Sequence, residues 1–83
     1  IKTGSEDYKS MLQRFIQQSP LDILEYKLVS EDGPAHERIF TSCAVLNNNV
    51  IGTGTAPSKR QSEQLAAYEA LKLFDALETD EKS

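Results

Sequence analysis

The sequence predicts an α+β domain in which two helices flank three strands, in the order α-β-β-β-α. Two amphipathic stretches with helical spacing occupy residues 7–18 and 58–78. Between them lie three short runs rich in branched and aromatic residues, separated by turns that contain Gly, Pro or Asn. Because strands joined by short turns pair antiparallel, these runs predict a three-stranded antiparallel sheet.

The first helix is predicted from Asp7 to about Gln18, ahead of Pro20. Apolar side chains recur on one side at steps of three and four residues: Tyr8, Leu12, Phe15 and Ile16. The opposite side carries a polar stripe of one hydroxyl, two amides and one guanidinium: Ser10, Gln13, Arg14 and Gln17. Such a stripe is typical of a solvated helix face as well as of a binding surface.

The three strands are predicted at residues 24–30, 38–46 and 50–55. The first turn contains Gly33 and Pro34, which expose its tip, and the second consists of three asparagines, which tolerate positive φ. In the middle strand the two alternating sets of side chains have nearly equal apolar content. The alternation therefore leaves the register of the strands open.

The second helix is predicted from Ser58 to about Glu78. Ser58 can accept a hydrogen bond from the first turn while Gln61 reaches back to the Ser58 amide, as in a capping box. One face is predicted to be buried by its small and apolar side chains: Ala67, Ala70, Leu71, Phe74 and Leu77. Lys59 and Arg60 extend from a helix N-terminus whose amides and dipole favour anions.

Glycines and alanines provide two places where backbones can approach closely. Gly52-Thr53-Gly54 lies in the third strand, where a loop that cradles a nucleotide is one interpretation. The Walker and dinucleotide-binding patterns are both incomplete here, which disfavours that interpretation. Ala66 and Ala67 in the second helix likewise leave room for another backbone.

Composition indicates one small domain, because the chain has 83 residues and 39% apolar content. The sequence shows no signal peptide and no apolar run that could span a membrane, so no membrane partner is expected. Since the chain begins at Ile1 rather than Met, we expect it to be a soluble piece of a longer protein. The lone Cys43 cannot form an internal disulfide, which predicts a reducing, cytoplasmic setting. His36 is the only other residue of a type that commonly binds zinc together with cysteine, so no zinc site is predicted.

The net charge of −4 disfavours a nucleic-acid partner when taken alone. Residues 75–83 hold four acids and one base, however, so residues 1–74 carry nine acids and eight bases, a balance of −1. The sequence also lacks the spaced motifs of hydrolases and zinc enzymes. We therefore predict no catalytic site within it. Because net charge alone does not identify the binding partner, the local arrangement of charged residues has to indicate it.

Four motifs carry a family resemblance: Leu12-Gln13, Gly33-Pro34-x-His36, Gly52-x-Gly54, and Ser58-Lys59-Arg60 followed by Ala66-Ala67-x-x-Ala70-Leu71. In this order, over residues 7 to about 75, they resemble the double-stranded RNA-binding domain. The resemblance implies that both helices pack on one face of the sheet, with Phe40, Ala44 and Leu46 toward the helices.

Further motifs are similar to the C-terminal domain of bacterial ribonuclease III: Asp7-Tyr8-Lys9-Ser10-x-Leu12-Gln13, Glu25-Tyr26, Gly33-Pro34-Ala35-His36 and Ser58-Lys59-Arg60-x-x-Glu63-Gln64. Many family members carry a third cation where this chain has Glu63, and an alanine where it has Ser62. The resemblance implies that Glu63 weakens the attraction of the second helix for phosphates, whereas Arg14 strengthens binding.

The resemblance implies three patches that contact one side of an A-form RNA duplex. The polar stripe of the first helix, with Ser10, Gln13, Arg14 and Gln17, enters one minor groove. The first turn, with Gly33, Pro34 and His36, meets the next minor groove. The start of the second helix, with Ser58, Lys59 and Arg60, faces phosphates across the intervening major groove.

The implied function is binding of double-stranded RNA as the substrate-binding domain of a ribonuclease III endoribonuclease. Residues 1–6 are expected to end a linker, residues 7–78 to form the domain and residues 79–83 an acidic tail. We expect no cofactor in this domain, and magnesium and homodimer contacts in a nuclease domain that precedes Ile1. The alternative is a protein-interaction or dimerisation module of the same fold with weak RNA binding.

Overall fold

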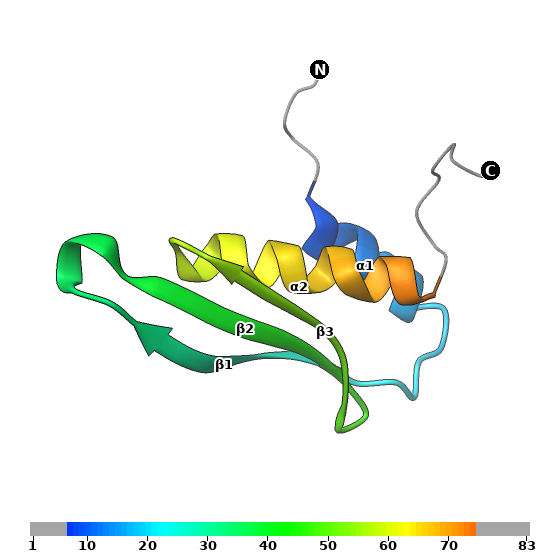
Figure 1. Ribbon diagram of the computed structural model, residues 1–83. Coiled ribbons are helices and arrows are strands. Elements are labelled where there is room, and N and C mark those ends of the chain that lie inside the picture. Colours follow the sequence, from blue (N-terminus) through cyan, green and yellow to red (C-terminus); the bar gives the residue numbers. More distant parts are fainter. Residues whose placement is uncertain (1–6, 75–83) are drawn as a thin grey trace, which may run out of the picture.

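The computed structural model describes residues 7–74. The elements are α1 (Tyr8–Ile16), β1 (Leu24–Asp32), β2 (Ile39–Leu46), β3 (Asn49–Ala56) and α2 (Lys59–Leu73), with a short 3-10 helix, η1 (Ala35–Glu37), between β1 and β2. Both helices lie on the same face of the three-stranded sheet (Figure 1). The predicted α-β-β-β-α order and the shared face are confirmed.

Apart from the end of the second helix, which stops at Leu73, the predicted boundaries differ from the observed ones by one or two residues. The first helix ends at Ile16 instead of Gln18. Gln17 is its C-cap, and the chain then turns as the Ser19 amide donates to the Ile16 carbonyl at 2.9 Å. β1 continues to Asp32, and the 3-10 helix that follows was not predicted. The predicted extension of the second helix to Glu78, the linker at residues 1–6 and the tail at residues 79–83 lie outside the described residues.

The sheet has the order β1-β2-β3 with antiparallel pairing throughout, and the structure sets the register that alternation left open. Ala44 pairs with Tyr26 on one side and Gly52 on the other, and it is fully buried beneath the helices. Leu46 packs against the same core, whereas Phe40 is only partly buried and lies outside the core cluster. Cys43 and Val45 are buried as well, because β2 has a neighbour on each side, which explains the near-equal apolar content.

The core joins α1 and α2 to the sheet through a small set of side chains: Leu12, Ile16, Ala44, Ala66, Ala67, Ala70 and Leu71. Phe15 was predicted on the buried side of the first helix but is 36% exposed. Its ring lies 5.4 Å from that of Phe74, at the edge of the core. The core therefore depends on small residues that bring backbones together rather than on large aromatic groups.

Gly52 and Gly54 allow β3 to lie directly against α2. A Cβ atom at Gly52 would overlap the carbonyl oxygen of Ala66, and one at Gly54 would overlap that of Ser62. The two glycines therefore serve the packing of a strand on a helix, which is the close approach that the alanine pair in α2 predicts. A nucleotide-binding role for this segment finds no support in the structure.

One polar contact crosses the otherwise apolar layer between sheet and helix. The hydroxyl oxygens of Ser42 in β2 and Ser62 in α2 lie 2.6 Å apart, and both residues are fully buried. The Ser62 hydroxyl donates to the Lys59 carbonyl at 2.7 Å, so the Ser42 hydroxyl donates to Ser62. Each buried hydroxyl thus has a partner, which offsets the cost of removing it from water.

This contact gives a first prediction. Replacing Ser62 by alanine should lower the free energy of unfolding by about 1–2 kcal/mol, because it leaves the Ser42 hydroxyl buried without a partner. Ser42→Ala should cost less, since Ser62 keeps its bond to Lys59. The double variant should be nearly as stable as the parent chain in urea unfolding. A double variant that loses the sum of the two single losses would contradict this account.

Candidate functional site

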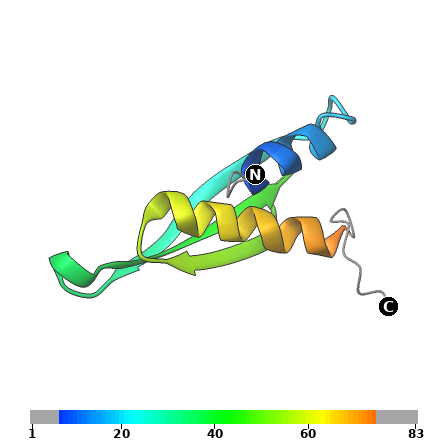
Figure 2. The same cartoon turned by 90° about the horizontal axis from the view of Figure 1, so that it is seen from above.

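The three predicted patches occur on three different elements of the fold. The first turn of α2 and the β1–β2 connection lie toward the same end of the molecule (Figure 1). Along the length of the molecule, the start of α2 lies between the β1–β2 connection and α1 (Figure 2). The structure therefore places the basic helix start between the other two patches.

The polar stripe on α1 is exposed at all four predicted positions: Ser10, Gln13, Arg14 and Gln17. Ser10 also takes part in capping α1, since its amide and hydroxyl bond to the two Asp7 carboxylate oxygens at 3.3 and 3.0 Å. The stripe offers two amide groups and a guanidinium to solvent, while the Ser10 hydroxyl is shared with the helix cap.

The β1–β2 connection is shaped by Gly33 and Pro34. Gly33 has a φ of 95°, and a Cβ there would overlap the Glu37 carbonyl oxygen. Pro34 precedes the 3-10 helix, and its carbonyl accepts from the Glu37 amide at 2.9 Å. His36 is exposed in the middle of this short helix. The turn residues thus hold a histidine outward at the tip, as predicted.

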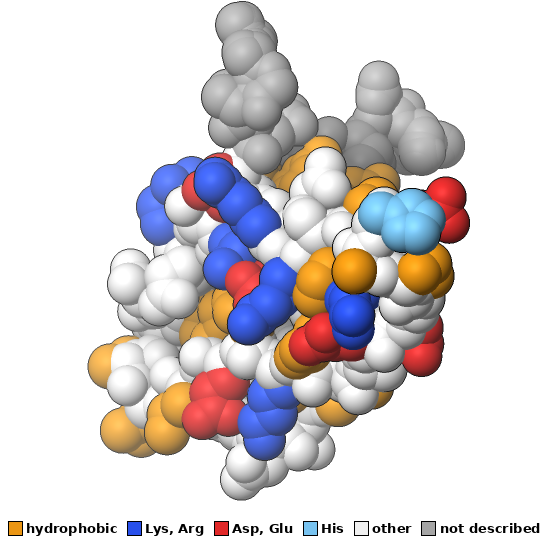
Figure 3. All heavy atoms as spheres, turned by 90° about the vertical axis from the view of Figure 1, so that its left-hand side faces the viewer, with side chains coloured by type: hydrophobic (Ala, Val, Ile, Leu, Met, Phe, Trp, Pro, Cys, Tyr) orange, Lys and Arg blue, Asp and Glu red, His pale blue; other side chains and the backbone are white. Residues whose placement is uncertain are grey.

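The start of α2 has the predicted cap with one difference. Ser58 accepts from the Gln61 amide at 3.1 Å, while the Gln61 side chain accepts from the Ser58 hydroxyl at 3.2 Å instead of reaching the Ser58 amide. Lys59 and Arg60 are exposed in the first turn. Figure 3 views this end of the molecule and shows basic side chains gathered on the surface, with acidic ones between them.

Glu63 of α2 is directed toward α1, where it pairs with Lys9. Its carboxylate lies 2.6 Å from Lys9 Nζ, and its side chain is 19% exposed against 34% for Lys9. Lys9, which the sequence did not predict as a site residue, therefore balances the negative charge of Glu63. This pairing reduces the negative potential that Glu63 adds beside Lys59 and Arg60.

Gln64 connects α2 to the beginning of α1. Its carbonyl oxygen accepts from the amides of Tyr8 and Lys9 at 2.8 and 3.2 Å, and its NH₂ group donates to Asp7 at 2.8 Å. The Gln64 bond and then the Ser10 bonds lower the pKa of Asp7. We call Asp7, Lys9, Glu63 and Gln64 the interhelical cap.

Tyr26 lies beneath the interhelical cap in β1. Lys9 Nζ is 4.9 Å from the centre of its ring, a distance suited to a cation–π contact. The Tyr26 hydroxyl is buried and has no hydrogen-bond partner among residues 7–74. Burial, followed by the nearby charges of Glu63 and Asp7, raises the pKa of Tyr26 to about 12, so this hydroxyl stays protonated at neutral pH.

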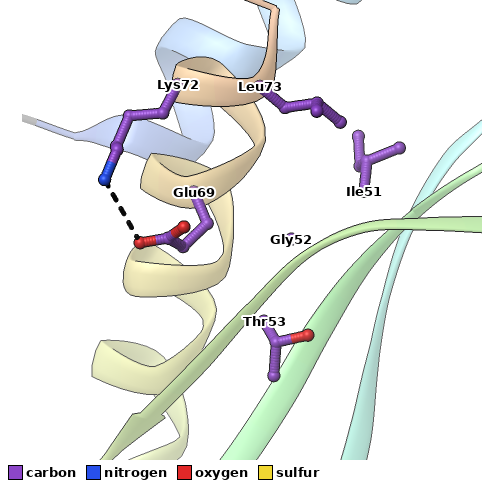
Figure 4. Close-up of a pocket in the computed structure, with 6 residues that line it drawn as sticks. All are labelled: Ile51, Gly52, Thr53, Glu69, Lys72 and Leu73. Carbon is purple, nitrogen blue, oxygen red and sulfur yellow. Dashed lines mark ion pairs between the residues drawn. The ribbon is translucent and has the colours of Figure 1, made fainter.

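Two surface hollows accompany these elements. One of about 480 Å³ lies between β3 and α2, where Lys72 and Glu69 form an ion pair of 3.8 Å (Figure 4). It contains none of the predicted site residues. The other, of about 360 Å³, lies beside the first turns of both helices and includes Gln61 and Gln64 in its lining.

The described part of the chain has neither a metal-binding cluster nor a membrane-spanning helix. Within residues 7–74, no group of three or more His, Cys, Asp or Glu side chains could hold a metal ion. No helix in this part of the chain is long and apolar enough to cross a membrane.

Comparison with known families and proteins gives matches that agree with this geometry. A family model described as "Double-stranded RNA binding motif" matches residues 8–73. Ribonuclease 3 of Halalkalibacterium halodurans is 52% identical over 65 residues, which cover 78% of this chain and 25% of the relative. Ribonuclease 3 of Shouchella clausii is 47% identical over 77 residues, which cover 93% of this chain and 30% of the relative.

A solved structure gives a further match. The solution structure of both double-stranded RNA-binding domains of DRB4 with their linker aligns with a TM-score of 0.60 and 25% identity. The alignment covers 94% of this chain and 50% of that chain. The chain thus spans between 25% and 30% of the two ribonuclease 3 relatives, and half of this structural neighbour.

Proposed function

Because the chain belongs to the double-stranded RNA-binding motif family, we propose that it binds A-form RNA duplexes through the three patches described above. The observation that carries this proposal is the position of the basic first turn of α2 between the polar stripe of α1 and the β1–β2 connection. In this order, one patch for a minor groove lies on each side of the patch for phosphates. Domains of this family contact two successive minor grooves and the phosphates of the major groove between them.

Each patch suits the groove assigned to it. The shallow minor groove of A-form RNA displays 2′-hydroxyls and base edges, which Gln13 and Gln17 can contact as both donors and acceptors. His36 can exchange hydrogen bonds with a 2′-hydroxyl at the tip of its turn. Lys59 and Arg60 meet phosphates, since the deep, narrow major groove excludes side chains from the bases. Recognition of this kind depends on duplex shape more than on sequence.

We also propose a place for this domain in a larger protein. The two ribonuclease 3 relatives described above are about three to four times as long as their matching segments, which supports a role as the substrate-binding part of a ribonuclease III endoribonuclease. In this proposal the nuclease activity, its magnesium ions and a homodimer interface belong to residues beyond those described. A cytoplasmic location is part of the same proposal.

A titration with four nucleic acids of equal length tests the proposed function. The 83-residue chain should bind duplex RNA, and should bind duplex DNA and either single strand much more weakly, because only A-form RNA offers 2′-hydroxyls at this groove spacing. Sedimentation at several concentrations, run beside the titration, measures self-association. Equal binding of RNA and DNA duplexes would contradict the proposal, and self-association without RNA binding would favour a dimerisation module.

A further inference from the structure

We propose that Gln64 is a positioning residue for duplex RNA binding, which holds the polar stripe of α1 at a set distance and angle from Lys59 and Arg60. This inference rests on the proposed function, because it concerns how two of the three patches are kept in register. Gln64 itself has no assigned contact with RNA. Its role follows from its place between the two helices that carry the patches.

The bonds of Gln64 are directional and join the helices at one point. Three hydrogen bonds link its side-chain amide to Asp7 and to the first two amides of α1. The adjacent ion pair between Glu63 and Lys9 adds a fourth polar link at the same place. The apolar contacts made by Leu12 and Ile16 are non-directional, so they hold α1 against α2 without setting its axial position as sharply.

α1 needs such a link because it is short. A helix of nine residues is marginal alone, and its first amides have no partner within the helix. Asp7 accepts from the Ser10 amide, and Gln64 accepts from those of Tyr8 and Lys9. A side chain of α2 thereby completes the N-terminal cap of α1, and the cap forms only when the two helices lie in this arrangement.

The spacing along α2 connects this cap to the phosphate patch. Glu63 and Gln64 follow Lys59 and Arg60 by four residues, so each cap residue lies one turn behind a basic residue on the same side of the helix. Basic side chains at the first turn and cap residues at the second thus belong to one rigid element. A binding site assembled from separate elements needs this kind of support, since small displacements separate groups that must engage together.

The test uses three variants that remove and then restore the Gln64 bonds. Gln64→Leu removes all three at similar volume, and Gln64→Glu still accepts from the α1 amides but cannot donate to Asp7. The double variant Asp7→Asn, Gln64→Glu exchanges the amide and the carboxylate between the two positions. Position 7 then donates a hydrogen bond to position 64, and the net charge equals that of the parent. Duplexes of about 16 base pairs, which engage both minor grooves, are compared with duplexes of about 8 base pairs, which cannot.

We expect Gln64→Leu to weaken binding of the long duplex about tenfold, which is the free-energy equivalent of one well-formed hydrogen bond. Binding of the short duplex should weaken about twofold at most. The Asp7→Asn, Gln64→Glu pair should return long-duplex affinity to within about twofold of the parent chain. Backbone amide resonances of Tyr8 and Lys9 should shift in Gln64→Leu and return in the pair. Gln18→Leu, an exposed glutamine outside the patches, is the matched control.

The outcomes separate this inference from the proposed function. If the parent chain binds no duplex RNA, the proposed function fails. If the parent binds duplex RNA and Gln64→Leu has the same affinity, the positioning role fails. It also fails if Gln64→Leu loses affinity equally for the long and the short duplex. Should Gln64→Leu prove unfolded by circular dichroism, the comparison of Gln64→Glu with the restored pair decides. A pair that regains the amide shifts without regaining affinity would also overturn the inference.

Discussion

Replacing Lys59 and Arg60 together by alanine should weaken binding of duplex RNA about 30-fold near 0.1 M salt, the equivalent of two phosphate contacts of about 1 kcal/mol each. Both side chains are exposed in the first turn of α2, so the change removes charge without opening the core. Alanine is also a strong helix former, and Ser58 remains as the N-cap. The variant should therefore fold like the parent chain.

The salt dependence provides a second measure of the same change. If Arg14, Lys59 and Arg60 each neutralise one phosphate, the logarithm of affinity should fall against the logarithm of salt with a slope of about −2.7, using the coefficient of duplex DNA. The alanine variant should retain a slope of about −0.9. Fluorescence anisotropy at several salt concentrations gives both slopes.

A matched control removes two positive charges elsewhere. Lys27 lies in β1 and Lys72 in the last turn of α2, and both are outside the three patches. Replacing this pair by alanine changes net charge by the same amount as replacing Lys59 and Arg60. An equal loss of affinity in the two double variants would show that overall charge, and not the first turn of α2, governs binding.

Replacing Gly54 by valine should lower the free energy of unfolding by about 3 kcal/mol, at the upper end of the usual cost of overpacking a core. A side chain at this position would overlap the Ser62 carbonyl and crowd the Ala66 amide, so β3 or α2 has to move. In a domain of this size such a loss corresponds to a fall in melting temperature of roughly 15 °C. Urea and thermal unfolding measure it.

Thr53→Val is the control for the glycine substitution. Thr53 precedes Gly54 in β3 but is exposed, and valine matches threonine in shape and strand preference. We expect this variant to stay within about 0.5 kcal/mol of the parent chain. A Gly54→Val variant as stable as Thr53→Val would mean that α2 tolerates a wider separation from β3 than the structure indicates.

Features encoded by neighbouring residues could be predicted from the sequence. The cap at Ser58, the turn at Gly33-Pro34 and the spacing of apolar side chains were enough to place the first helix, the three strands and the start of the second helix to within two residues. Their bonds join residues three or four positions apart, as in the Ser58–Gln61 contact. The prediction was less accurate where a turn continues as another element, as with the short helix at residues 35–37.

The glycines at positions 52 and 54 show an intermediate case. Their sequence pattern indicates a close backbone approach but does not identify what approaches. A ligand phosphate and a helix backbone both satisfy the pattern, because glycine leaves the same space for either. The tertiary contacts with Ala66 and Ser62 assign that space to α2.

Order of elements, helix caps and the residue types of the three patches follow from local chemistry, which acts between neighbours along the chain. Strand register and the interhelical cap follow from long-range packing. Gln64 contacts residues 55 to 57 positions earlier, and Glu63 a lysine 54 positions earlier, so no spacing rule brings them together. The family resemblance implied that Glu63 would oppose phosphate binding, but Glu63 faces Lys9 because folding lays α1 beside α2 and places a positive charge at that point.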